Sequence, residues 1–147
     1  MKDYRKLLFI YKNPHDPQDI VTRAVNYGSN AIAYCILNGT KTMNLKAGFD
    51  VWFPKIIKNA NGKIAVFAYH QLDNTDHAKQ AKKMLSRIKA HSGQLAGVMV
   101  YAKPLTYRVK QADAETYMKA LRAGYSGRID VVIHDADLKA DSVQGLC

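Results

Sequence analysis

The stretch "VFAYHQLDNTDHAKQA", residues 66–81, gives the clearest indication of the fold class. It starts as a continuous apolar run, leaves that run at Tyr69-His70, crosses a polar turn and continues with helical spacing. A continuous apolar run bounded by turn residues is typical of a strand that is covered on both faces, as in parallel sheets. The stretch therefore predicts one strand-turn-helix unit of an α/β protein.

The same unit recurs along the chain, because five apolar runs alternate with segments of helical spacing. The runs cover residues 7–11, 31–37, 64–69, 95–101 and 129–133. The helices are expected to begin at Pro17 after Asp16, near residue 55 after Pro54, near residue 75 or 76, and at a cap on Asp113. This alternation predicts a single α/β domain over residues 1–147, with about five parallel strands and right-handed crossovers.

The number of units limits the possible architectures. A closed eight-stranded barrel typically needs about 250 residues, and this chain has 147. Two alternatives remain, an incomplete TIM-like (β/α) barrel and an open doubly wound sheet. An incomplete barrel leaves open sheet edges. We therefore expect a homodimer, docking into a larger assembly, or coverage of the edge by the tail of the chain.

The charge of the chain is strongly positive, with 22 Lys and Arg against 12 Asp and Glu. A net charge of +10 favours attraction to nucleic acid, anionic cell-wall polymers or acidic proteins. A solvated basic surface explains it equally well. The helix expected near residue 76 has an apolar stripe, and its opposite face carries Lys79, Lys82, Lys83 and Arg87. That face could contact phosphates, although a solvent-facing side of an amphipathic helix is the commoner explanation.

Several classes of protein are disfavoured. The longest apolar runs have strand length, so no membrane insertion is expected. The apolar run near the N-terminus is too short for a signal peptide and is interpreted as the first strand. The two cysteines, Cys35 and Cys147, define neither a disulfide framework nor a metal site. A reducing compartment such as the cytoplasm is expected.

Candidate site residues lie where the predicted strands end, because ligands of parallel α/β folds bind at the carboxyl ends of strands. Tyr11, Tyr69 and Tyr101 lie near such ends, whereas Tyr34 is expected in the middle of its strand. These tyrosines could line a pocket for a sugar or a base. Tyrosine also suits strands in general, with its hydroxyl at the wet end of a core.

Polar residues follow the same strand ends. His70 and Asp73 follow the third strand, and His134, Asp135 and Asp137 follow the fifth. Histidine and aspartate together can hold a metal or transfer protons, which would suit a small hydrolase. Aspartates in turns also cap helices.

The sequence contains no HExxH, paired CxxC, P-loop, GxGxxG or GxSxG motif, and we expect neither a metal nor a cofactor. The predicted ligand-binding set is Tyr11, Tyr69, His70, Asp73, Tyr101, His134 and Asp135.

Four segments resemble a known family. They are "NAIAYCILNGT", "FDVWFPKIIKNANGKIAVFAYHQ", "HAKQAKKMLSRI" and "YMKALRAGYSGRIDVVIH". Residues from about 27 to 93 are similar to the front half of the family-25 glycoside hydrolases, the Chalaropsis-type lysozymes of phages and bacteria. The resemblance implies a (β/α) barrel that cleaves peptidoglycan with carboxylates at its strand ends.

The chain lacks the acidic residues that the family uses for catalysis. In the family an acid closes the first strand and an Asp-x-Glu pair closes the fourth. Here the corresponding segments, "LLFIYKN" and "LAGVMVYAKP", contain no acid, and the single glutamate, Glu115, lies in a helix. The Tyr69-His70 position is retained, together with Asp50. The resemblance and its gaps predict a non-catalytic lysozyme-like protein for binding or assembly, of phage or prophage origin. Such a protein is expected in the host-cell cytoplasm or in a virion. A cell-wall glycan is its expected partner, and nucleic-acid binding and a small hydrolase are the alternatives.

Overall fold

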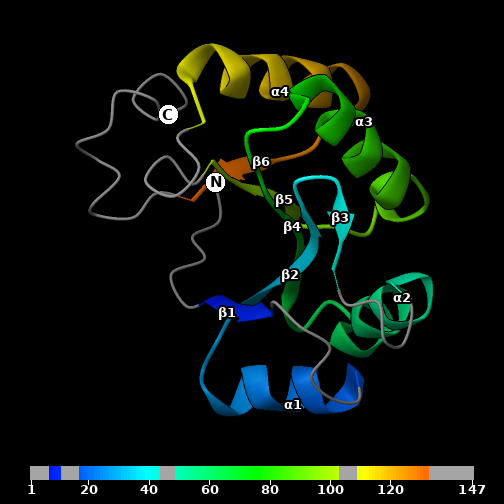
Figure 1. The fold of residues 1–147 in the computed structure, drawn as a ribbon. Coiled ribbons are helices and arrows are strands. Elements are labelled where there is room, and N and C mark those ends of the chain that lie inside the picture. Colours follow the sequence, from blue (N-terminus) through cyan, green and yellow to red (C-terminus); the bar gives the residue numbers. More distant parts are fainter. Residues whose placement is uncertain (1–6, 11–16, 44–48, 103–108, 133–147) are drawn as a thin grey trace.

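The computed structural model describes residues 7–10, 17–43, 49–102 and 109–132 (Figure 1). These residues form one sheet with helices between its strands. The strands are β1 (Leu7–Ile10), β2 (Ala31–Asn38), β3 (Lys41–Thr42), β4 (Ala65–Gln71), β5 (Gly97–Tyr101) and β6 (Ile129–Val131). The helices are α1 (Pro17–Asn26), α2 (Phe49–Ala60), α3 (His77–Ile88), which continues into a 3₁₀ turn η1 (Lys89–His91), and α4 (Gln111–Gly124).

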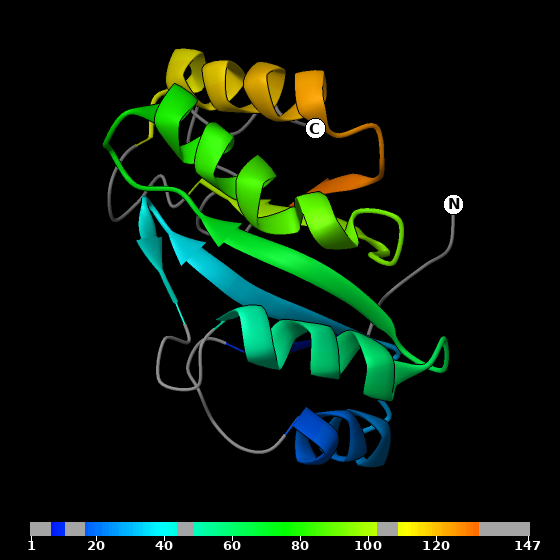
Figure 2. The same ribbon diagram turned by 90° about the vertical axis from the view of Figure 1, so that its right-hand side faces the viewer.

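The strand order identifies the type of α/β fold. The sheet runs β1-β2-β4-β5-β6 with every neighbouring pair parallel, and the short β3 pairs antiparallel with β2. Each crossover therefore steps in the same direction, and the order never reverses as it does in a doubly wound sheet. The sheet is open and is wound like part of a barrel, with its helices on one side (Figure 2).

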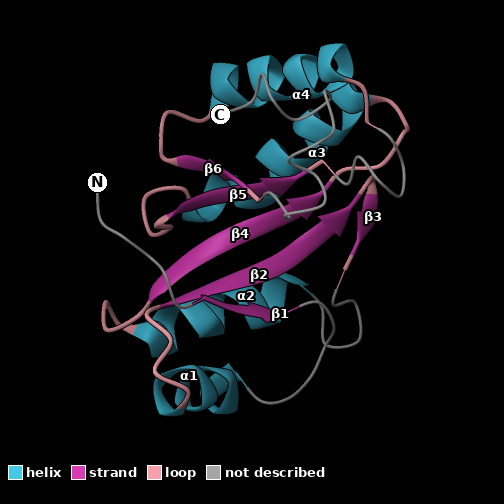
Figure 3. Cartoon of the chain, turned by 90° about the vertical axis from the view of Figure 1, so that its left-hand side faces the viewer, coloured by secondary structure: helices cyan, strands magenta, loops and turns pink. Residues whose placement is uncertain are grey.

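The two faces of the sheet carry two separate apolar layers. The first layer joins alternate strand residues such as Ile32, Val66 and Val98 to buried residues of all four helices. The second layer is formed by the intervening strand residues, with the side chains of Ala31, Ala33, Cys35, Phe67, Tyr69 and Met99 at its centre. Within the described chain this layer contains no helical residue. Figure 3 views the sheet from this second side.

The helix ends follow the expected signals in part. α1 begins at Pro17, and Gly28 ends its last turn with φ +67°, its N–H donating to the carbonyl of Val25 at 2.9 Å. α3 is capped by Asp76, whose carboxylate accepts from the Lys79 N–H at 3.0 Å.

Two helix starts were predicted wrongly. α4 begins at Gln111, so Asp113 lies in its first turn and does not cap it. α2 begins at Phe49, so Pro54 lies inside the helix. Burial of Phe53 and Ile56, on either side of Pro54, holds α2 against the sheet despite the missing proline N–H.

The open sheet leaves β1 and β6 as its outer strands among the described residues. The homodimer or larger assembly expected from such edges stays a prediction. In the same part of the chain, no helix combines the length and apolar character needed to cross a bilayer.

Candidate functional site

The carboxyl edge of the sheet is joined by backbone hydrogen bonds across three strands. The N–H of Gly39, just beyond β2, donates to the carbonyl of Gln71 at 2.7 Å. The N–H of Leu72 donates to the carbonyl of Tyr101 at 2.8 Å. These bonds hold the ends of β2, β4 and β5 side by side, at the edge where ligands of parallel α/β folds bind.

His70 is fully buried at this edge, with 0% of its surface exposed. Its Nε2 lies 2.8 Å from the carbonyl oxygen of Gly39, which can only accept, so Nε2 carries the proton. Its Nδ1 lies 2.7 Å from the hydroxyl of Tyr117 in α4, and in the neutral ring Nδ1 accepts from that hydroxyl. Both ring nitrogens are thus engaged within the protein, and His70 ties β4 to the β2 end and to α4.

Electrostatics favour the neutral form of His70. Burial lowers its pKa from 6.5 to about 4, against smaller raising effects of the hydrogen bond to the Gly39 carbonyl and of the Asp73 charge. The ring is therefore neutral at pH 7. Its burial and its two hydrogen bonds suit a structural link, because a general acid or base must reach the substrate.

Asp73 lies in the turn between β4 and α3, where its oxygens meet a local network. Its Oδ1 accepts from the N–H of Thr75 at 2.9 Å and from the Nε2 of Gln80 at 3.1 Å. Gln80 is fully buried and also accepts from the N–H of Asp73 at 3.3 Å. His77 adds a hydrogen bond from Nε2 to the Asp73 carbonyl at 2.7 Å. Asp73, which follows β4 at this edge, is thus part of a hydrogen-bonded turn. The sequence pattern of Asp, Asn and Thr predicts such a turn.

Tyr69 points to the opposite face of the sheet from His70, since neighbouring strand residues alternate. Its ring is buried in the second apolar layer and meets Phe9 edge-on, with ring centroids 5.5 Å apart.

Gln71 follows two residues after Tyr69 on the same face, and its Nε2 lies 3.5 Å from the Tyr69 hydroxyl. In the β4–β5 register Gln71 is paired with Tyr101, which is half-buried. Tyr69, Gln71 and Tyr101 therefore form one cluster, which we call the edge cluster. Gln71 was missed in the sequence, where its only signal was the two-residue spacing from Tyr69.

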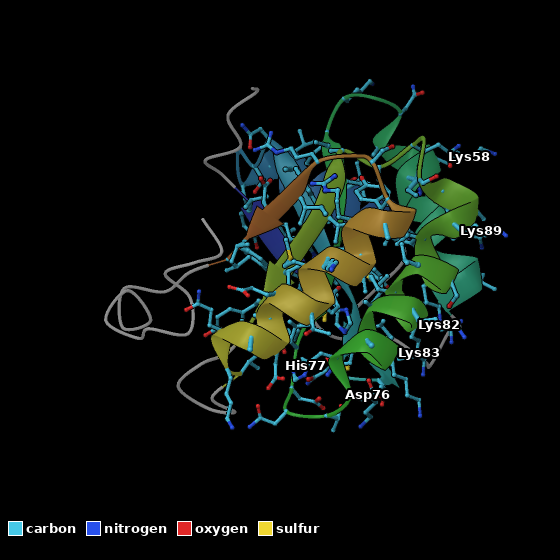
Figure 4. The ribbon with its side chains drawn as sticks, turned by 90° about the horizontal axis from the view of Figure 1, so that it is seen from above. Lys58, Asp76, His77, Lys82, Lys83 and Lys89 are labelled. Atoms are coloured by element: carbon cyan, nitrogen blue, oxygen red, sulfur yellow. The ribbon has the colours of Figure 1, made fainter. Side chains whose placement is uncertain are left out.

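The predicted basic face of α3 divides into two parts. Lys79 and Lys82 are exposed. Lys83 donates to the carbonyl of Thr40, and Arg87 donates to the Thr42 hydroxyl at 3.1 Å, so both hold the β2–β3 segment against α3. Figure 4 shows Lys82, Lys83 and Lys89 along α3 and η1.

The remaining candidates fall outside what the structure describes. These are Tyr11, His134, Asp135 and Asp137, together with the side chain of Asp50 in α2. In the described part of the chain, no group of three or more His, Cys, Asp or Glu side chains is placed to hold a metal ion.

Solved structures with the same fold include three carbohydrate-active enzymes. A family 25 glycosyl hydrolase from Bacillus anthracis matches 89% of this chain with a TM-score of 0.59 and 15% identity. The modular autolysin LytC from Streptococcus pneumoniae, solved with a synthetic peptidoglycan ligand, matches 91% with a TM-score of 0.63 and 17% identity. A chitinase from Chromobacterium violaceum matches 95% with a TM-score of 0.53 and 15% identity. The chain thus has the fold of lysozyme-like glycosyl hydrolases.

The match covers only part of those proteins. The chain spans 61% of the Bacillus anthracis protein, 33% of LytC and 50% of the chitinase. No family model matches the sequence, and no curated protein matches it.

Proposed function

We propose that this chain is a lysozyme-like protein that binds cell-wall glycan without cleaving it. The observation that carries the proposal is the chemistry of the carboxyl edge. There the half-buried ring of Tyr101 is the accessible member of the edge cluster, beside the buried Tyr69 and Gln71. The nearby acid, Asp73, is engaged in its own turn. The fold supports a glycan as ligand, since one of the structures that share it was solved with a peptidoglycan ligand.

Retained catalysis would need two carboxyl groups about 5–9.5 Å apart across the glycosidic bond. β5 ends in Val98, Met99, Val100 and Tyr101, none of which can give or take a proton from a sugar as a carboxyl group does. Apart from Asp73, the acids whose side chains the structure describes lie in helices or their caps, or pair with arginine. They are Asp19, Asp76, Asp113, Glu115 and Asp130.

A hydrolase that uses the His/Asp residues is less well supported. The two of these residues that the structure describes, His70 and Asp73, have structural roles. His70 is buried and hydrogen-bonded at both nitrogens, and Asp73 closes a turn. A phage or prophage origin, suggested by the family resemblance, remains part of the proposal and would agree with a binding or assembly role.

The proposal is tested by sedimentation with insoluble peptidoglycan. Tyr101→Ala removes the half-buried aromatic ring of the edge cluster and should weaken binding by about tenfold, the loss of about 1.4 kcal/mol. Tyr27→Ala is the matched control, since Tyr27 is 70% exposed in the turn between α1 and β2. The control should bind like the wild type. Equal binding by all three proteins, or no binding by the wild type, would overturn the proposed site.

A further inference from the structure

A pocket of about 870 Å³ opens at the amino edge of the sheet, opposite the edge cluster. It lies between the end of α2, the first residues of β4 and the segment that joins η1 to β5. Its lining includes the apolar side chains of Ile57, Ile64 and Leu95, which we call the floor. We call it the amino-edge pocket. Its volume is in the range of sites that hold small molecules.

The rim of the amino-edge pocket is cationic. Lys58, Lys63 and His91 line it, and both lysines are exposed. Lys89, also exposed, lies two residues before His91, and Figure 4 shows it on the same side of the molecule as Lys58.

Among the described residues, no acid compensates this charge from within the lining. The described lining residues all belong to residues 54–66 and 90–96, and the sequence has no Asp or Glu between Asp50 and Asp73 or between Asp76 and Asp113. The ion pairs between described residues, Asp19–Arg23 and Arg128–Asp130, lie elsewhere. A concave site lined by one sign of charge concentrates ions of the opposite sign.

Parts of the rim are fixed before any ligand arrives. Phe53 meets the His91 ring edge-on, with centroids 5.6 Å apart, and His91 Nδ1 lies 3.4 Å from the Gln94 Oε1. On the other side, the turn at Asn61 (φ +45°) and Gly62 (φ +70°) reverses the chain after α2, and the space beside Gly62 is open. The entry is thus bordered by the Asn61-Gly62 turn and by the imidazole of His91, which contacts Phe53.

We propose that the amino-edge pocket binds a small organic phosphate. The phosphate is held at the rim by Lys58, Lys63 and His91, since lysine is a common phosphate binder in proteins. The apolar body of the ligand contacts the floor. The site lies at the opposite edge of the sheet from the edge cluster, so it can be occupied independently of a glycan.

The rim is tested with inorganic pyrophosphate in ¹H–¹⁵N NMR spectra at low ionic strength. Saturable shifts are expected at the amides of Gly62 and Gln94. The double variant Lys58→Gln/Lys63→Gln should weaken binding at least about tenfold. Lys110→Gln/Lys119→Gln is the matched control, because it removes the same charge from exposed positions at and in α4 that do not line the pocket. It should change the affinity less than about twofold.

Two results would overturn the rim assignment. One is the absence of saturable shifts at millimolar pyrophosphate. The other is an equal loss in both double variants, which would show attraction by the net charge alone. The spectra of the variants also show directly that each of them is folded.

The floor is tested with AMP and adenosine, which share the same nucleoside with its aromatic base and differ in the phosphate. AMP should bind at least about tenfold more tightly than adenosine and more tightly than pyrophosphate. Equal binding of AMP and adenosine would overturn the phosphate site. AMP binding no tighter than pyrophosphate would overturn the role of the apolar floor.

Discussion

The hydroxyl of Tyr117 in α4 lies 2.7 Å from Nδ1 of His70 in β4, and both side chains are fully buried. This contact joins the sheet to the helix layer at the carboxyl edge. It also explains why a histidine can occupy the core, since the carbonyl of Gly39 and the Tyr117 hydroxyl satisfy both of its nitrogens.

Tyr117→Phe removes the donor to His70 and leaves a buried nitrogen without a partner. We expect a loss of about 1–3 kcal/mol in the free energy of unfolding, measured by urea denaturation. Tyr27→Phe, at an exposed tyrosine, is the control and should change stability by less than about 0.5 kcal/mol. Indistinguishable stabilities of the two variants would contradict the assigned hydrogen bond.

Tyr34→Phe, unlike Tyr117→Phe, should not lower the free energy of unfolding. Tyr34 is also fully buried, and it stacks on Phe53 with centroids 5.7 Å apart, but its hydroxyl has no hydrogen-bond partner among the residues that the structure describes. Burial raises the pKa of this hydroxyl, which stays protonated. Removing an unsatisfied buried hydroxyl should leave stability unchanged or raise it by about 1 kcal/mol. A loss comparable to that of Tyr117→Phe would show that the Tyr34 hydroxyl does have a partner.

The stability of the protein should depend on pH through His70. Its pKa is about 4 in the folded protein and 6.5 in the unfolded chain, so between these values the unfolded state binds more protons. The free energy of unfolding should therefore fall as pH drops from about 6.5 to about 4, by up to about 1.4 kcal/mol per pH unit from this residue. The measurement is urea denaturation at a series of pH values.

Two variants separate the contribution of His70 to this pH dependence from that of the other titrating groups. His70→Gln should be less stable at pH 7 and should lack this part of the slope, whereas His91→Gln, at a half-buried surface histidine, should keep it. A wild-type slope that His70→Gln leaves unchanged would contradict the buried, neutral state of His70.

Gly39→Ala should destabilise more than Gly62→Ala. Both glycines have a left-handed backbone, with φ +58° and +70°, which costs an L-residue about 1–2 kcal/mol. At Gly39 a Cβ atom would also lie 2.0 Å from Oδ2 of Asp73, whereas at Gly62 it would meet open space. The difference between the variants in urea denaturation therefore measures how tightly the Asp73 turn packs on Gly39. Equal effects would mean that this turn can move aside without cost.

The sequence predicted the alternation of strands and helices because continuous apolar runs and Pro, Asp and Gly signals are local. It left the incomplete barrel and the doubly wound sheet open, since strand order depends on contacts between distant segments. It also missed β3, whose two residues carry no apolar pattern of their own.

The candidate site was predictable only in part. The sequence placed Tyr69, His70 and Asp73 at a strand end, and the structure finds them there. The sequence did not predict the hydrogen-bond partners of these side chains. Tyr117 is 47 residues from His70, and Gly39 is 31 residues away, so the burial of the histidine depends on segments that no local pattern links to it.

One experiment measures glycan binding and glycan cleavage together. The protein is incubated with purified peptidoglycan, and the bound protein and the newly formed reducing ends are determined in the same sample. We expect retention of the protein on the polymer, reduced in Tyr101→Ala, with no reducing ends above a buffer control. Release of reducing ends that grows with time and protein concentration would contradict it.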